Sequence, residues 1–213
     1  GNIVLDAGQT QSSYDSVQTS TNSGLLSSTT TSTQTQASAA TAQVSTISAK
    51  NVSVIADQNL VSVGTEFKGS NSVTIEGKDT TTLYAATNTR QSTTTTQSTT
   101  TLGGAFSAIA GGITLEDKTT TDSTATASSI ATRLISNEKI TIGVGNRTEL
   151  QGTEVQAPQI AFVKTDPNKK GELILGGSTN TTQTTHTEKT ETAAGYQKNK
   201  AHASTTQTPT QHQ

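Results

Sequence analysis

The chain has 213 residues, a net charge of −2 and a mean hydropathy of −0.47, and only 29% of its residues are hydrophobic and 3% aromatic. So few apolar residues argue against a compact globule with a thick core. The near-neutral net charge does not indicate the positively charged surface that a nucleic-acid-binding protein needs. The lack of cysteine excludes disulfides and thiolate chemistry. A thin core repeated along an axis stays compatible with this composition, because each repeat then needs few apolar residues.

The first 43 residues start with the apolar triplet IVL and continue almost entirely in Ser, Thr and Gln. Two polar arms at roughly 9–23 and 28–43 flank a small tip, Gly24-Leu25-Leu26. Threonine is β-branched and favours a solvent-facing strand. The pattern therefore predicts a long antiparallel hairpin with an apolar tip.

Residues 46–86 contain short triplets in which two apolar residues flank a third residue. Val52 lies 21 residues before Val73, and Val61 lies 22 before Leu83; the triplets are Val52/Val54, Val61/Val63, Val73/Ile75 and Leu83/Ala85. Period-two alternation indicates strands, and a recurrence near 20 residues is typical of a parallel β-helix whose strands stack one coil apart. A β-sandwich is the alternative, but it would require larger and more aromatic inward residues.

A second polar region covers residues 88–130, with a Gly-rich segment, Gly103–Gly112, between two Thr-rich arms. It predicts another hairpin, which would be held best by docking on a neighbour, because cross-strand Thr pairs contribute only ~0.2–1 kcal/mol each. A disordered, glycosylated stalk is the alternative. Stalks of that kind are rich in proline, and the three prolines lie outside these arms.

Residues 134–159 repeat residues 46–71 at an offset of 88, and both copies contain the motif Gly-Thr-Glu, at Gly64 and at Gly152. The segment 171–196 then resembles the first two polar regions. We therefore predict an all-β right-handed parallel β-helix with hairpin excursions over residues 1–196, in about two and a half units of ~80–90 residues. Residues 197–213 are polar, and we expect them to be a frayed tail or linker.

These motifs resemble the repeats of filamentous-haemagglutinin-type exoproteins of two-partner secretion, a family that includes adhesins and contact-dependent growth-inhibition proteins. Residues 135–160, "ISNEKITIGVGNRTELQGTEVQAPQI", fit one block of that repeat, and residues 1–24, "GNIVLDAGQTQSSYDSVQTSTNSG", fit the next, with Tyr14 and Ser16 in its Tyr-x-Ser positions. His186 stands where Tyr is usual, and a longer loop, "KTDPNKKGE", replaces a short turn. The resemblance implies a secreted or cell-surface rod of a Gram-negative bacterium, an outer-membrane secretion partner, and a target-cell surface protein or glycan as ligand.

We expect no enzyme activity, no cofactor and no metal site, since carboxylates are scattered and no histidine pair has ligand spacing. Asp166 and Asn168 hint at an EF-hand loop, but Lys170 and Gly177 occupy ligand positions. Adhesion is the expected function, with toxin delivery across the target outer membrane as the alternative. Partners include neighbouring coils of the same long chain and exclude nucleic acid; the candidate contact residues are the apolar ones at the hairpin tips, Leu25, Leu26, Leu102, Phe106, Ile109 and Ile113.

Overall fold

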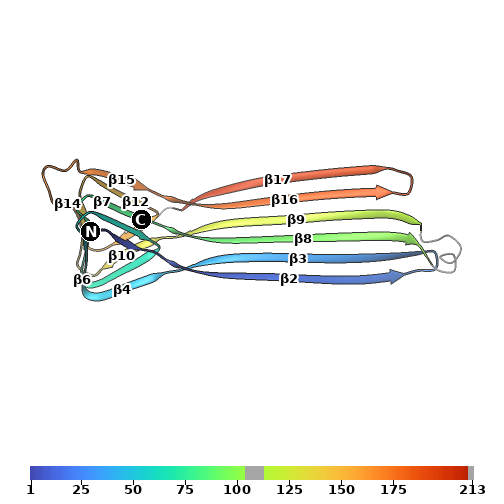
Figure 1. Cartoon of the computed structure of the whole chain (residues 1–213), viewed down its shortest axis with the longest axis horizontal. Helices are drawn as coiled ribbons and strands as arrows, with labels where there is room; N and C mark the ends of the chain where they lie inside the picture. Colours follow the sequence, from blue (N-terminus) through green and yellow to red (C-terminus); the bar gives the residue numbers. More distant parts are fainter. Residues whose placement is uncertain (104–112, 211–213) are drawn as a thin grey trace.

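The structure is a computed structural model, which describes residues 1–103 and 113–210. Its described residues form strands in three sheets (Figure 1). The first parallel sheet contains β1 (Ile3–Leu5), β5 (Asn59–Val63), β7 (Thr80–Tyr84), β12 (Arg147–Gln151) and β15 (Glu172–Gly176). The second contains β4 (Ser45–Ala56), β6 (Thr65–Gly77), β10 (Thr132–Ser136), β11 (Lys139–Val144), β13 (Thr153–Gln156) and β14 (Gln159–Lys164).

The third sheet is antiparallel and extends away from the other two, while the N-terminus lies beside the parallel sheets (Figure 1). We call it the arm sheet. Its strands are β2 (Gly8–Ser23), β3 (Ser27–Gln43), β8 (Ala86–Leu102), β9 (Thr114–Ile130), β16 (Ser178–Thr192) and β17 (Gln197–Thr210). The predicted polar arms are therefore ordered strands, and the hairpins dock on one another through the pairs β3–β8 and β9–β16.

The chain passes alternately through the two parallel sheets, and we call one passage a layer. Val52 in β4 lies opposite Val73 in β6, and Ile140 in β11 lies opposite Ile160 in β14, which confirms the predicted stacking of apolar triplets. Val73 also lies opposite Ile140, although 67 residues separate them, because the β8–β9 hairpin leaves the stack in between. The 88-residue repeat is therefore two layers plus one hairpin.

A thin core lies inside the layers. Its buried side chains come mainly from alternate positions of the second sheet, with Leu60, Leu83 and Leu150 from the first. Small polar residues complete the first sheet's inner face: Ser62, Thr81 and Thr148 are fully buried. The predicted stacking of Val61 on Leu83 is wrong, because Ser62 lies opposite Leu83 and Val61 lies opposite Thr82. Side chains alternate across a strand, and Ser62 holds the inward position, so the apolar pair marks the outer face.

The Gly-Thr-Glu motif marks the layers that have no hairpin. In these layers the chain turns directly from one sheet to the other at Gly64 and Gly152, each with φ of 59°. The Glu66 and Glu154 carboxylates then bind Arg133 of the intervening layer, at 3.1 and 3.0 Å. One arginine thus links three consecutive layers.

Two strands per hairpin match two layers of the stack. Neighbouring strands lie about 4.8 Å apart in any sheet, so one hairpin and two layers are each about 9.6 Å thick. A hairpin on every second layer therefore fills the arm sheet without a gap.

The expectation of a frayed tail after residue 196 is wrong for the described part of that segment. Residues Gln197–Thr210 form β17, which pairs with β16 from Glu191 to Ser178. The reason is that β16 offers an unpaired edge, and a strand exposed on both faces needs no apolar alternation to pair with it.

Candidate functional site

The described ends of the three hairpins lie at the far end of the arm sheet (Figure 1). The Gly103 amide donates to the Leu26 carbonyl at 3.1 Å, which joins the second hairpin to the first. The Ala193 amide donates to the Leu115 carbonyl at 3.0 Å, which joins the third hairpin to the second. These contacts join the described ends of the three hairpins in one surface, which we call the apolar tip.

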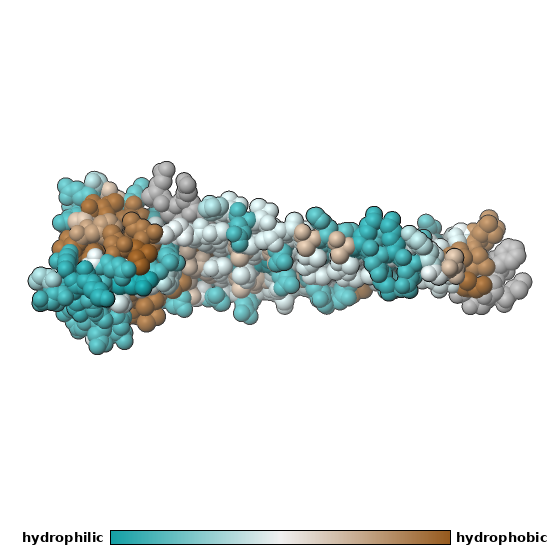
Figure 2. All heavy atoms as spheres, turned by 90° about the horizontal axis from the view of Figure 1, so that it is seen from above, coloured by the Kyte–Doolittle hydropathy of each residue, from teal (hydrophilic) through white to brown (hydrophobic). Residues whose placement is uncertain are grey.

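The apolar tip exposes large hydrophobic side chains. Leu25 is 85% exposed, Leu26 66% and Ile113 51%, whereas Leu102 is half-buried. Figure 2 shows hydrophobic atoms at this end of an otherwise largely polar shaft. The structure thus brings together four of the six candidate contact residues; Phe106 and Ile109 lie outside the described residues.

Sequence reasoning missed one member of this surface. Tyr196 is 61% exposed and closes the third turn, where the Thr192 amide donates to its carbonyl at 3.0 Å. The signal was present: "TAAGY" occupies the small-residue tip position of the third polar region. Because the expected frayed tail began directly after Tyr196, this tyrosine was not among the predicted tip residues.

The shaft keeps the apolar tip far from the core. Strand β2 has 16 residues, which corresponds to roughly 50 Å of extended chain. Hydroxyl pairs between neighbouring strands, such as Thr29–Thr100 at 3.1 Å and Thr21–Thr30 at 3.3 Å, make both faces of the shaft polar. The parallel sheets therefore cannot bury the tip side chains.

A family model described as "Hemagglutinin repeat" matches residues 26–165, from the turn of the first hairpin to the residue after β14. The chain belongs to the haemagglutinin-repeat family. The match covers about two thirds of its residues. No curated protein and no solved structure matches the chain.

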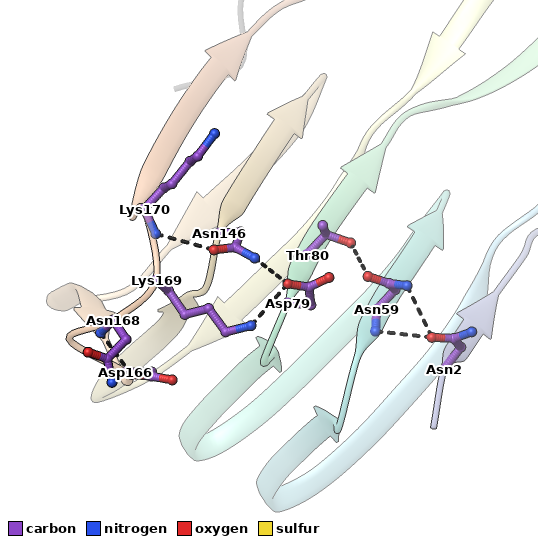
Figure 3. A network of polar contacts seen from close by, with 9 residues as sticks. All are labelled: Asn2, Asn59, Asp79, Thr80, Asn146, Asp166, Asn168, Lys169 and Lys170. Atoms are coloured by element: carbon purple, nitrogen blue, oxygen red, sulfur yellow. Dashed lines mark hydrogen bonds and ion pairs between the residues drawn. The ribbon is translucent and has the colours of Figure 1, made fainter.

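A polar network at one corner of the layers is a second place to look for a site in this haemagglutinin-repeat chain (Figure 3). Asp79 accepts hydrogen bonds from the Asn146 side chain and, at 3.1 Å, from Lys169. The hydrogen bond from Lys169, then that from Asn146, lowers the pKa of the Asp79 carboxyl. Since Asp79, Asn146 and Lys169 come from successive layers, the network ties layers together.

The loop beside that corner contains Asp166 and Asn168, the two residues that hinted at an EF-hand. The Asp166 carboxylate accepts the Asn168 amide at 2.8 Å, so the two residues form a local turn. Within residues 1–103 and 113–210, no group of three His, Asp or Glu side chains lies close enough to hold a metal ion.

Glu149 is the one ionisable side chain among the buried residues of the described chain, and it lies on the outer face of the first sheet. Arg147 and Gln151 donate to its two oxygens at 2.8 and 2.6 Å. Burial, followed by the charge of Glu149, raises the pKa of the neighbouring Tyr84 hydroxyl. Glu149 is satisfied by its own strand, which indicates a structural role.

In the described part of the haemagglutinin-repeat chain there is no helix with the length and hydropathy that a membrane span needs.

Proposed function

We propose that this chain is a rod segment of a large secreted or surface-exposed exoprotein of a Gram-negative bacterium, and that it mediates attachment to another cell. Membership of the haemagglutinin-repeat family supports the rod. The observation that carries the adhesive role is the apolar tip at the end of a polar shaft.

The rod is proposed to be a right-handed parallel β-helix. Stacked parallel strands satisfy one another's backbone groups along the axis, so length is gained without a thick core. Neighbouring coils of the same long chain continue the stack in this proposal, and an outer-membrane partner secretes it. No catalytic step and no nucleic-acid ligand is proposed.

The apolar tip is proposed to bind a protein or glycan on the target-cell surface. Full burial of one leucine is worth about 1.5–3 kcal/mol, but ordering and association costs offset much of this gain. One tip therefore binds weakly. A rod that presents many tips gains avidity, because every later contact is intramolecular.

The test compares attachment of beads coated with the chain and with the double variant Leu25→Ser/Leu26→Ser. We expect the variant to lose about tenfold or more in attachment, since two exposed apolar contacts are removed. The matched control is Val17→Ser: Val17 is 62% exposed but lies midway along the shaft. Equal attachment by all three proteins would exclude a role for the tip.

A second candidate function is engagement of the target outer membrane followed by passage of a toxin. The same tip favours it, because exposed apolar side chains on a stiff polar shaft can enter a lipid interface. Binding to vesicles that contain neither protein nor glycan would support this candidate. Binding only to cell surfaces that carry protein or glycan would support adhesion.

A further inference from the structure

Two of the three histidines of the chain lie side by side on the arm sheet. His186 lies near the middle of β16, and the antiparallel register places His202 of β17 directly opposite it. Directly opposed residues point to the same face of a sheet, with their Cβ atoms about 4.5–5.5 Å apart. Sequence reasoning did not pair these histidines, because metal-ligand motifs were sought only at short spacings.

The strand on the other side of β16 supplies a carboxylate to this pair. Asp122 in β9 lies opposite His186, and its Oδ1 atom is 2.5 Å from the His186 Nδ1 atom. An ionised carboxylate only accepts hydrogen bonds, so Nδ1 of His186 is the donor. In a neutral imidazole the other nitrogen, Nε2, then keeps its lone pair. The contact with Asp122 therefore makes Nε2 the nitrogen of His186 that can bind a metal ion.

Histidines that bind metal ions in proteins have this kind of neighbour. They almost always donate the second ring N–H to a carboxylate, a carbonyl or a water, which fixes the ring and its tautomer. A metal–nitrogen distance of about 2.0–2.1 Å is within reach of two imidazoles on directly opposed residues. Asp122 orients His186 and is not itself a ligand, so the site has two protein ligands and water fills the other positions. It therefore does not need a group of three His, Asp or Glu ligands, which the described residues lack.

The charges near the two histidines are compatible with a bound cation. The residues that share their row across the arm sheet carry no positive side chain: Ser16, Thr35, Thr94 and Asp122. In the next row toward the apolar tip, Lys200 lies opposite Glu188, and the Glu188 carboxylate is 3.6 Å from the Lys118 ammonium. The carboxylate of Asp122 is therefore the charge that a bound ion would meet in its own row.

An ion bound by both histidines would hold the edge strand in its register. Strand β17 is the last in the order of the arm sheet, and among the described strands it pairs only with β16. The register of a strand that is polar on both faces is weakly specified, and a slip by one residue turns every side chain to the other face. Such a slip would separate His202 from His186, so metal binding favours the observed register.

We propose that His186 and His202 bind a divalent transition-metal ion such as Zn²⁺, and that the ion fixes β17 on β16. Imidazole nitrogen suits Zn²⁺, Ni²⁺ and Cu²⁺, whereas Mg²⁺ and Ca²⁺ prefer oxygen ligands. Asp122 is a positioning residue of this site. The inference does not depend on the proposed adhesive function, because the pair lies along the shaft and not at the apolar tip.

The test titrates the full chain with Zn²⁺, and separately with Mg²⁺, in a calorimeter at neutral pH. We expect one Zn²⁺ per chain and no binding of Mg²⁺. His202→Gln should weaken Zn²⁺ binding by about tenfold or more, since it removes one of two protein ligands, and Asp122→Ala by about tenfold, since His186 loses its hydrogen-bond partner. The matched control is His212→Gln, which changes the third histidine of the sequence and should leave the affinity unchanged.

Amide exchange in β17 provides a second measurement. Zn²⁺ should slow this exchange in the parent chain and in His212→Gln, but not in His202→Gln, because only a bridged strand is held in place. Circular dichroism checks that each variant keeps its strands. Three results would overturn the inference: no Zn²⁺ binding by the parent, unchanged affinity in His202→Gln, or Zn²⁺ binding that leaves exchange in β17 unaltered.

Discussion

Gly64 and Gly152 occupy a position that no other residue type accepts easily. Their φ of 59° lies in the left-handed region, and a Cβ on Gly64 would lie 2.4 Å from the Ala86 Cβ. At Gly152 the nearest atoms, 2.8 Å away, are the Ala85 and Ser178 Cβ atoms. At both glycines the backbone runs between the residues where two hairpins begin. Because glycine has no side chain, a layer without a hairpin can lie close to the neighbouring layers that have one.

Replacing Gly64 by alanine should lower the free energy of unfolding by about 2 kcal/mol or more, because left-handed strain and the contact with Ala86 add together. Chemical denaturation followed by circular dichroism measures the change. Gly8→Ala is the control: a Cβ there would meet the Gln43 Cβ at an ordinary 3.6 Å. A loss as large in Gly8→Ala as in Gly64→Ala would show that the tight turn is not the cause.

At the scale of elements, the hairpins stabilise one another. Strand β8 pairs with β3 on one side and β9 on the other, so the central hairpin joins the two outer ones. Neither face of the arm sheet is apolar, and an isolated two-stranded hairpin is only marginally stable in water. The arm sheet is therefore ordered because its strands lie side by side, and their spacing is set by the layers.

Excising residues 86–130, with Ala85 joined to Ala131 through one glycine, tests this dependence. We expect faster amide exchange in β3 and β16, because a gap about two strands wide, ~9.6 Å, would separate them. Excising 178–210 instead should leave β3 protected, since β8 stays in place. Undiminished protection of β3 in the first variant would show that single hairpins are stable alone.

For the whole molecule, carboxylates that link successive layers make the stack sensitive to acid. The pKa of Asp57 is lowered, first by the hydrogen bond from Lys78 and then by its charge, and that of Asp79 is lowered by Lys169 and Asn146. A carboxyl with a lowered folded-state pKa stabilises the fold above its unfolded pKa, 3.8 in both cases. This stabilisation is lost as the pH falls through the folded-state pKa.

We therefore expect the midpoint temperature of thermal unfolding to decrease as the pH is lowered from about 6 to about 3. Asp79→Asn should have a lower midpoint than the parent at the higher pH and a smaller difference from it at the lower pH. Differential scanning calorimetry across this range measures both. A difference between the two proteins that stayed constant with pH would contradict the assignment to Asp79.

Patterns within short segments predicted much of this molecule. The alternation around Val52 and Val73 predicted stacked strands, and the two polar arms around Gly24-Leu25-Leu26 predicted a hairpin with an apolar tip. Both depend on local properties: β-branched side chains favour strands, and period-two patterns mark inner faces. The same logic failed at Val61 and Val63, where the inward position is polar.

Other features depended on partners distant in sequence. Strand β17 has no apolar alternation, and Pro209 fits there because β17 is an edge strand. The joined tips combine residues from all three hairpins. The sequence by itself determined the repeat, the strands and the turn glycines, because these follow from the conformational preferences of neighbouring residues. Only the tertiary structure decided the arm sheet and the joined tips, because the stacking distance of the layers brings separate hairpins into register.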